Sequence, residues 1–383
     1  MDLKISNQIN TIHCMKDNKI AVIIAWRDLW HPNCGGAEIY ITKVAEKLRD
    51  CGYKVIFFTE CYKGAKREEE INGIEYIRRG NAVTLHAYFP IYFKKHLKNS
   101  CNVLIENFNA VPFRIPRIHS NTLTVIHHIQ SPEWETLLGK FLGRLVARYF
   151  TESLTKTYKD KGKIVTVSPS SKKDLVSLDF EEKNINIIYN GIEVPIARSI
   201  EKPSDQINIL SLGRVRPTKH IDEAIEMIKY SLTKNIKNIH LDIVGTGDDE
   251  KRLQSLVKEY GLEQFVTFWG FVNEKKKIEL LQKAHLHVQF SRKEGWGITV
   301  IEASASATPT ICYRVPGLVD SVKDNTGYFI DGSLKNTWEK AINDIRENNH
   351  NYQSKQEKGM EWARNFKWEA QMENFMRYLE SSE

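Results

Sequence analysis

Two glutamates, Glu294 and Glu302, bracket an otherwise apolar, glycine-containing stretch, EGWGITVIE. A hydrophobic core has no use for them, because burying an unpaired charge is strongly unfavourable. A carboxylate can accept hydrogen bonds from both hydroxyls of a vicinal diol. Either the two acids are exposed by accident, or they hold a polar ligand, in which case one acid could bind a ribose and the other a sugar ring.

Cations and glycines lie where a diphosphate between two such sugars could bind. Arg214 follows a glycine at the end of a predicted strand, and Lys219 lies near the start of the next helix. Alone, such residues are more often an ordinary basic surface, but helix N-termini attract anions. Gly245 and Gly247 at the next strand end, and Gly297 before a later helix, would let the backbone approach a ligand closely. Together they predict an anion site beside the glutamates.

Alternating strands and helices must position these residues. The apolar run at 19–26 predicts a strand buried on both faces, followed by a glycine-containing loop and a helix that ends near Gly52. Strand and helix patterns alternate through the rest of the chain, which predicts parallel sheets with crossover helices. We therefore predict an α/β fold of two Rossmann-like, doubly wound domains that face a central cleft. Such sheets bind ligands at the carboxyl ends of their strands.

The length of 383 residues also favours two domains. A polar, proline-bearing segment near 195–206 is the best linker. We predict an N-terminal domain over residues 1–195 and a C-terminal domain over residues 196–365. A helix over residues 366–383 is expected to pack back on the N-terminal domain.

The composition argues against several classes of protein. The six cysteines are scattered and form no C-x-x-C pair, so neither a zinc site nor a disulfide framework is indicated. No apolar run is long enough to span a membrane, and no secretory signal is visible. Zinc-finger, RRM and helix-turn-helix patterns are missing too, so nucleic acid is not an expected partner. We expect a cytoplasmic protein, with peripheral association at the inner membrane face as an option.

Basic charge is concentrated in the first half of the chain. Residues 1–200 carry a net charge of +8 and the remainder carries −1, which gives the total of +7. In that half, the segments 86–99 and 139–163 interleave aromatic residues with lysine and arginine. They are either amphipathic helices at an anionic membrane surface or helices that pack their apolar face on the sheet.

Several sequence blocks, in their order along the chain, resemble one enzyme family. EGWGITVIE matches the E-x7-E pattern of the retaining GT-B glycosyltransferases of family 4. Further blocks that are similar to that family are HPNCGGAEIYITKVAEKLRDCGYKV, LGRVRPTKHIDEAI, VGTGDDEKRL, VTFWGFV, VPGLVDSVKDNTGYFI and FKWE. The resemblance covers nearly the whole chain. It implies a GT-B fold, with acceptor binding in the N-terminal domain and nucleotide-sugar binding in the C-terminal domain.

The resemblance also implies a role for each site residue. Glu302 would bind the nucleotide ribose, and Glu294 would bind the donor hexose. His127 would lie near the 6-hydroxyl of the sugar, with His128 as the competing choice. The implied catalytic residues are His127, Arg214, Lys219 and Glu294. The implied donor-binding residues are Gly35, Gly36, Gly245, Gly247, Gly297, Ile298, Thr299 and Glu302.

The implied activity is hexosyl transfer, with retention of anomeric configuration, from a nucleotide-sugar donor to a glycan, glycolipid or small-molecule acceptor. UDP is the default nucleotide, and GDP is an alternative. No D-x-D triplet occurs in the sequence, so Arg214, Lys219 and a helix N-terminus would replace a metal, and no cofactor is expected. The alternative is a GT-B sugar-nucleotide epimerase or a glycogen-synthase-like enzyme. NCGGAE lacks the G-x-G-x-x-G spacing that a dinucleotide oxidoreductase would need.

Two positions depart from the family pattern. His220 stands where the family usually has a glycine after the diphosphate-binding lysine. Ala307 stands where it usually has a glycine before Thr308 and Pro309.

Overall fold

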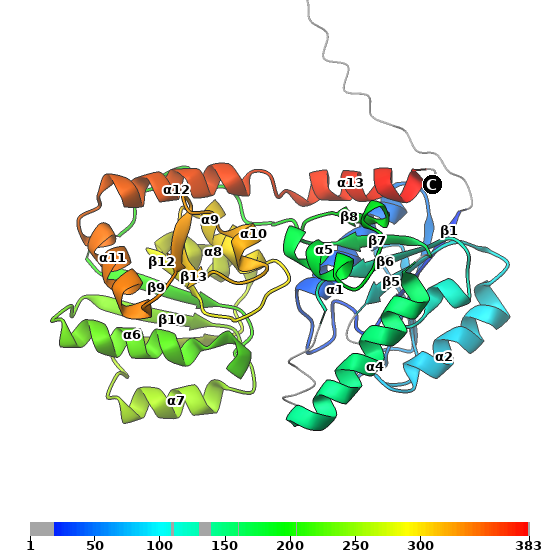
Figure 1. Cartoon of the computed structure of the whole chain (residues 1–383), viewed down its shortest axis with the longest axis horizontal. Coiled ribbons are helices and arrows are strands. Elements are labelled where there is room, and N and C mark those ends of the chain that lie inside the picture. Colours follow the sequence, from blue (N-terminus) through cyan, green and yellow to red (C-terminus); the bar gives the residue numbers. More distant parts are fainter. Residues whose placement is uncertain (1–18, 109–110, 130–138, 160, 204, 382–383) are drawn as a thin grey trace, which may run out of the picture.

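The structure is a computed structural model that describes residues 19–108, 111–129, 139–159, 161–203 and 205–381. It contains two sheets whose strands are parallel except for the edge strand β3, and each sheet is covered by helices, as Figure 1 shows. The predicted α/β fold of two Rossmann-like domains is confirmed. Within the described ranges, no helix is both long and apolar enough to cross a bilayer.

The N-terminal domain is built on an eight-stranded sheet of order β3-β4-β2-β1-β5-β6-β7-β8. Its central strand β1 is buried along nearly its whole length, as expected for a β-branched run in a parallel sheet. The strands are β1 (Ile20–Ala25), β2 (Lys54–Thr59), β3 (Glu68–Ile71), β4 (Ile74–Arg78), β5 (Cys101–Phe108), β6 (Thr122–Ile126), β7 (Lys163–Thr166) and β8 (Ile185–Ile187). The α-helices described in this domain are α1 (Gly36–Asp50), α2 (Leu85–Tyr92), α4 (Lys140–Tyr158) and α5 (Pro169–Val176).

The C-terminal domain is built on a six-stranded parallel sheet of order β11-β10-β9-β12-β13-β14. The strands are β9 (Ile207–Leu212), β10 (Ile239–Val244), β11 (Val266–Gly270), β12 (Leu286–Gln289), β13 (Thr310–Tyr313) and β14 (Gly327–Ile330). The helices are α6 (Ile221–Thr233), α7 (Glu250–Glu259), α8 (Glu274–Lys283), α9 (Ile298–Ala305), α10 (Leu318–Ser321), α11 (Leu334–Arg346) and α12 (His350–Ala363). The loops at the carboxyl ends of the neighbouring strands β9 and β12 contact the other domain, through Arg214 beside Gly35 and through Gly295 beside His127.

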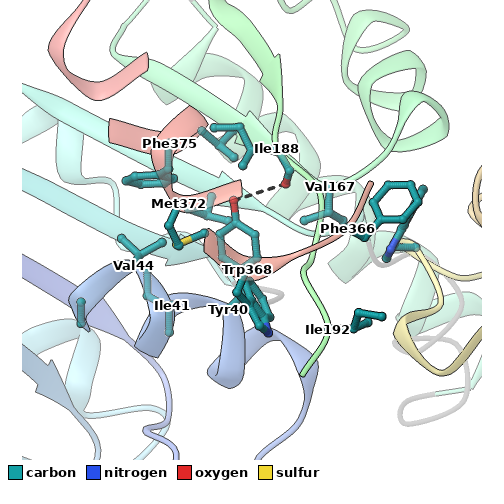
Figure 2. Close-up of a cluster of buried hydrophobic side chains, with 14 of the residues drawn as sticks. Tyr40, Ile41, Val44, Val167, Ile188, Ile192, Phe366, Trp368, Met372 and Phe375 are labelled. Carbon is teal, nitrogen blue, oxygen red and sulfur yellow. Dashed lines mark hydrogen bonds between the residues drawn. The ribbon is translucent and has the colours of Figure 1, made fainter. Parts of the chain in front are cut away.

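The last helix, α13 (Trp368–Glu380), crosses back to the N-terminal domain, as the sequence predicted. Figure 2 shows Trp368 and Phe375 among buried side chains of α1 and of the segments that follow β7 and β8. In this cluster the hydroxyl of Tyr40 donates a hydrogen bond to the Ile188 carbonyl at 3.3 Å. Lys163 Nζ donates to carbonyl oxygens at the carboxyl end of α13, where a cation is favoured.

The antiparallel strand β3 was missed by the sequence analysis. It joins β4 through a tight turn in which Asn72 and Gly73 both have positive φ, the usual requirement of a two-residue hairpin. Its three consecutive glutamates disfavour a strand by propensity. They are accepted here because Glu69 pairs with the buried Arg78 and Glu68 pairs with Arg79.

A buried carboxyl group links α4 to the centre of the N-terminal sheet. Glu106 on β5 accepts hydrogen bonds from the Tyr158 hydroxyl at 2.5 Å and from the Phe113 backbone N–H at 2.8 Å. Burial raises the pKa of Glu106 to about 7, although both of these contacts favour the ionised form.

This raised pKa predicts how folding stability depends on pH. The folded state holds a proton on Glu106 that the unfolded state releases near pH 4.5, so the stabilisation is complete below that pH and is lost as pH rises to about 7. The loss is on the order of 3 kcal/mol. Urea titrations across this range should show a flatter decline in the free energy of unfolding for Glu106→Gln than for the wild type. If the free energy of unfolding declined equally in both proteins, the raised pKa of Glu106 would be contradicted.

Candidate active site

The glycine loop before α1 meets the C-terminal domain at the predicted donor site. A methyl group added at Gly35 would lie 3.8 Å from the guanidinium carbon of Arg214. One added at Gly36 would lie 2.7 Å from Ile298 Cδ1, too close for an unshifted side chain. The structure therefore brings these four predicted residues together from two domains, and only glycine fits at position 36 without movement of Ile298.

Glu38 fixes the conformation of this glycine loop. Its Oε2 accepts a hydrogen bond from the Gly35 N–H at 2.7 Å, which forms one half of a capping box at the start of α1. Burial is the main cause of the raised pKa of Glu38, which the hydrogen bonds and Arg214 oppose. The sequence analysis did not select Glu38, although the spacing of an acid three residues after an N-cap was a usable signal.

Lys219 and Glu294 form an ion pair between the loops that follow β9 and β12. Lys219 Nζ contacts Glu294 Oε1, and Gln289 Nε2 donates to the same oxygen at 2.7 Å. Burial alone would raise the pKa of Glu294, but Lys219 and the hydrogen bonds hold it below its usual range. Glu294 is therefore ionised at neutral pH and can accept hydroxyl hydrogen bonds. Gln289 was not selected from the sequence, because glutamine at a strand end has no distinctive pattern.

Glu302 is also paired with a lysine, which the sequence analysis missed. Lys277 Nζ on α8 lies 2.7 Å from Glu302 Oε1 on α9. The Glu302 side chain is only 10% exposed, so its carboxylate depends on this partner for charge compensation. Nothing in the run Lys275, Lys276 and Lys277 distinguishes the third lysine from its neighbours before the helices are packed.

The start of α9 presents backbone N–H groups on the same side of the domain. Gly297 has φ +90° and begins the helix in a left-handed conformation that favours glycine. Ile298 and Thr299 belong to the first turn, where backbone N–H groups have no partner within the helix. With Arg214 and Lys219 these groups could stabilise an anion. This role of Gly297, Ile298 and Thr299 stays a prediction.

Gly245 and Gly247 are required by the packing of the protein itself. A methyl group at Gly245 would overlap the Gly213 carbonyl, and one at Gly247 would overlap the Val215 carbonyl. These close approaches join the loop after β10 to the loop after β9 that carries Arg214. This packing explains both glycines without a ligand and does not exclude one. The role of Gly245 and Gly247 in donor binding stays a prediction.

The two histidines at the end of β6 occupy different environments. The His127 ring is buried, with Nε2 2.9 Å from Asn107 Oδ1, and it is nearly perpendicular to the Tyr40 ring, with the ring centroids 5.3 Å apart. Burial lowers the pKa of His127 to about 3, and His128 adds to this shift. The charge of His128 lowers the pKa of Glu294. The assignment of His127 stays a prediction, and the structure couples its competitor His128 to the predicted sugar-binding acid.

Direct contacts hold the two domains together beside the site. Ser170, in the first turn of α5, donates its backbone N–H to Asp320 Oδ2 at 2.9 Å. Lys293 Nζ donates to the Ile129 carbonyl at 3.1 Å. A methyl group at Gly295 would lie 2.7 Å from the His127 carbonyl oxygen. The segment that carries Glu294 is therefore packed directly against the N-terminal domain.

At the two positions that depart from the family pattern, the backbone has a left-handed conformation that favours glycine. His220 has φ 49° and Ala307 has φ 55°, both in the left-handed region. The first is the N-cap of α6, and the second ends the turn after α9. Each side chain is therefore held at some conformational cost where glycine would have none.

Comparisons with known proteins assign both domains. Residues 34–194 match the family model described as Glycosyltransferase Family 4, and residues 195–363 match the model described as Glycosyl transferases group 1.

Curated relatives and solved structures are similar over most of the chain. An uncharacterized glycosyltransferase of Methanocaldococcus jannaschii is 26% identical over 314 residues, which are 76% of this chain and 79% of the relative. The GPI3 subunit of phosphatidylinositol N-acetylglucosaminyltransferase from Saccharomyces cerevisiae is 22% identical over 342 residues, or 83% of this chain and 74% of the relative. The structure of HepE from Anabaena in complex with UDP-glucose has a TM-score of 0.72 at 15% identity and covers 95% of this chain and 100% of its own.

The two family matches adjoin at the linker and together span residues 34–363, and the sheets and their helices form the fold that the resemblance implied. The chain is therefore a GT-B glycosyltransferase that belongs to family 4, with a group 1 glycosyltransferase domain at its C-terminal side.

Proposed function

We propose that the protein moves a hexosyl group from a nucleotide-sugar donor to a carbohydrate or lipid-linked acceptor, with retention of configuration and without a metal. UDP-sugars are the first choice of donor. The observation that carries this proposal is a set of contacts: Arg214 and Lys219 line one pocket, Lys219 pairs with Glu294, and Arg214 and the start of α9 both lie against the glycine loop before α1. HepE, a structural neighbour, is described in complex with UDP-glucose.

The mechanism follows from where charge develops. Breaking the bond between the anomeric carbon and the diphosphate leaves negative charge on the phosphate and positive charge on the sugar ring. Arg214, Lys219 and the α9 N–H groups would stabilise the leaving diphosphate, as fixed donors do most effectively in a site that excludes water. The acceptor would attack from the face that the phosphate leaves, with the phosphate as base. Domain closure would suppress hydrolysis.

A donor panel tests this proposal. UDP- and GDP-sugars should be compared by thermal shift and by slow donor hydrolysis, with and without EDTA. We expect one nucleotide class to stabilise the protein and activity to persist with EDTA. Loss of activity with chelator would overturn the metal-independent part. Conversion of a UDP-sugar alone into its epimer would favour the alternative enzyme class.

We further propose that the acceptor is reached at an anionic membrane surface through α4. The carboxyl half of α4 packs on the domain through Leu154 and Tyr158, so the alternative interpretation holds for that half. In the amino half, four large apolar side chains are more than half exposed: Phe141, Leu142, Leu145 and Tyr149. Arg144 and Arg148 lie among them and are exposed as well.

Such a mixture of exposed apolar and basic residues on one helix is typical of interfacial binding. Figure 1 shows α4 along the outside of the N-terminal domain, with its amino end projecting beyond the sheet. The yeast relative, GPI3, is named as a subunit of phosphatidylinositol N-acetylglucosaminyltransferase.

Vesicle binding tests the surface. Phe141→Ser combined with Leu145→Ser should reduce co-sedimentation with phosphatidylglycerol-containing vesicles by at least about tenfold, because each apolar side chain contributes at least about 1.5 kcal/mol of transfer free energy. Phe271→Ser, at an equally exposed aromatic of the other domain, is the matched control and should bind normally. Absence of wild-type binding at low salt would remove the proposal.

A further inference from the structure

Lys277 occupies a position that the activity described so far does not use. Its Nζ lies 2.7 Å from Glu302 Oε1 and 2.8 Å from Glu274 Oε2. The Lys277 and Glu302 side chains are 16% and 10% exposed, whereas that of Glu274 is 69% exposed. The lysine therefore reaches inward from α8 to an acid on α9, and an acid at the helix surface holds it from the solvent side.

The packing of α8 does not require this lysine. The helix is anchored by Leu280 and Leu281, which are both buried in the hydrophobic core. Lys276 and Lys283, on the same helix, pair with Glu279 at its surface. Lys277 alone of these three is directed at an acid that the family resemblance places on the nucleotide.

We propose that Lys277 is a positioning residue for nucleotide binding, which holds the Glu302 carboxylate ionised and oriented so that it can accept hydrogen bonds from both ribose hydroxyls. The inference rests on the proposed function, since it assumes that Glu302 binds a ribose. Lys277 occupies one oxygen on the α8 side, and the carboxylate keeps its remaining acceptor positions for the diol. A neutral acid could not accept both hydroxyls as well.

The charges around Glu302 support this role. Burial raises the pKa of Glu302, Lys277 is the cation that opposes the rise, and Glu274 adds to it. Among the described residues, Lys277 and Glu274 are the charged groups that shift the pKa of Glu302. Without Lys277 the pKa of Glu302 should rise further, so the acid would take up a proton at a higher pH than it does in the wild type.

Calorimetric titration with UDP and 2′,3′-dideoxy-UDP separates this role from a purely structural one. Lys277→Met should weaken UDP binding by about tenfold, which is the usual effect of losing one charge-assisted hydrogen-bond arrangement. Binding of the dideoxy nucleotide should change little. UDP affinity of the variant should recover as pH rises, whereas that of the wild type should stay flat. Lys277→Arg should restore most of the affinity.

Lys275→Met is the matched control, because it removes the same charge from an exposed position of the same helix. It should bind both nucleotides as the wild type does. Melting temperatures should be recorded for every variant.

Each other outcome has a distinct meaning. If the wild type binds neither UDP nor GDP, the proposed function fails. If the wild type prefers UDP to its dideoxy analogue and Lys277→Met keeps the same affinity and preference, the inference about Lys277 is wrong. An equal loss for both nucleotides, or a loss that does not depend on pH, would show only a structural ion pair and would also overturn it.

Discussion

Lys219→Ala should lower the turnover of the enzyme by about 100-fold or more. Loss of one preorganised charge stabiliser at a leaving group typically has an effect of this size. The variant also leaves Glu294 without its cation, and the Glu294 side chain is only 15% exposed. Its pKa should then rise, because burial is the largest influence on it and Lys219 is the main group that opposes that influence.

Steady-state kinetics with the donor chosen from the nucleotide-sugar panel provide the measurement. Turnover should fall more than the Michaelis constant for the donor rises, because the developing phosphate charge belongs to the transition state. Lys251→Ala, at an exposed position of α7, is the control and should keep normal turnover. Unchanged turnover in Lys219→Ala would refute the assigned role.

The sheets and the general location of the site were predictable from the sequence, because they depend on local patterns. Apolar runs such as that of β1 alternate with amphipathic helices, and parallel sheets collect their ligands at one edge. The loops that carry Arg214 and Glu294 follow β9 and β12, which are neighbours in the sheet. Their approach therefore follows from topology once the alternation is recognised.

The partners of the two acids were not predictable in the same way. Lys277 lies 25 residues from Glu302 in sequence, on a separate helix, and its two neighbouring lysines have the same local pattern. Only the packing of α8 against α9 selects it. The strand β3 was missed for a related reason, because its glutamates are stabilised by Arg78 and Arg79 through contacts that composition does not reveal.

The glycines divide into two groups that the sequence could not separate. Gly36 and Gly295 permit close approach between the two domains, whereas Gly245 and Gly247 permit close approach between loops of one domain. The neighbour of Gly36 is the Ile298 side chain, and those of the other three glycines are backbone carbonyls; a motif can place none of them. A glycine-rich motif therefore indicates where the backbone is crowded, but not whether the crowding group is a ligand or the protein.

At Gly317 the crowding group is the backbone of Glu294, the acid predicted to bind the donor sugar. Gly317 has φ +83°, outside the range that most residues adopt, and a methyl group on it would overlap the backbone carbonyl of Glu294. The Glu294 N–H also donates a hydrogen bond to the carbonyl of Pro316 at 3.3 Å, so the backbones of residues 294 and 316–317 are in direct contact. A side chain at position 317 must therefore displace the backbone of Glu294.

Gly317→Ala should consequently reduce turnover by roughly 10- to 100-fold, since a shift of about 1 Å in a positioned group can have an effect of this size. The left-handed strain should also destabilise the protein by about 1 kcal/mol or more. Gly332→Ala is the matched control, because that glycine has no atom near its added methyl group and no positive φ. It should keep both turnover and melting temperature. Normal turnover in Gly317→Ala would show that Glu294 tolerates displacement, and its assignment to the donor sugar would then be wrong.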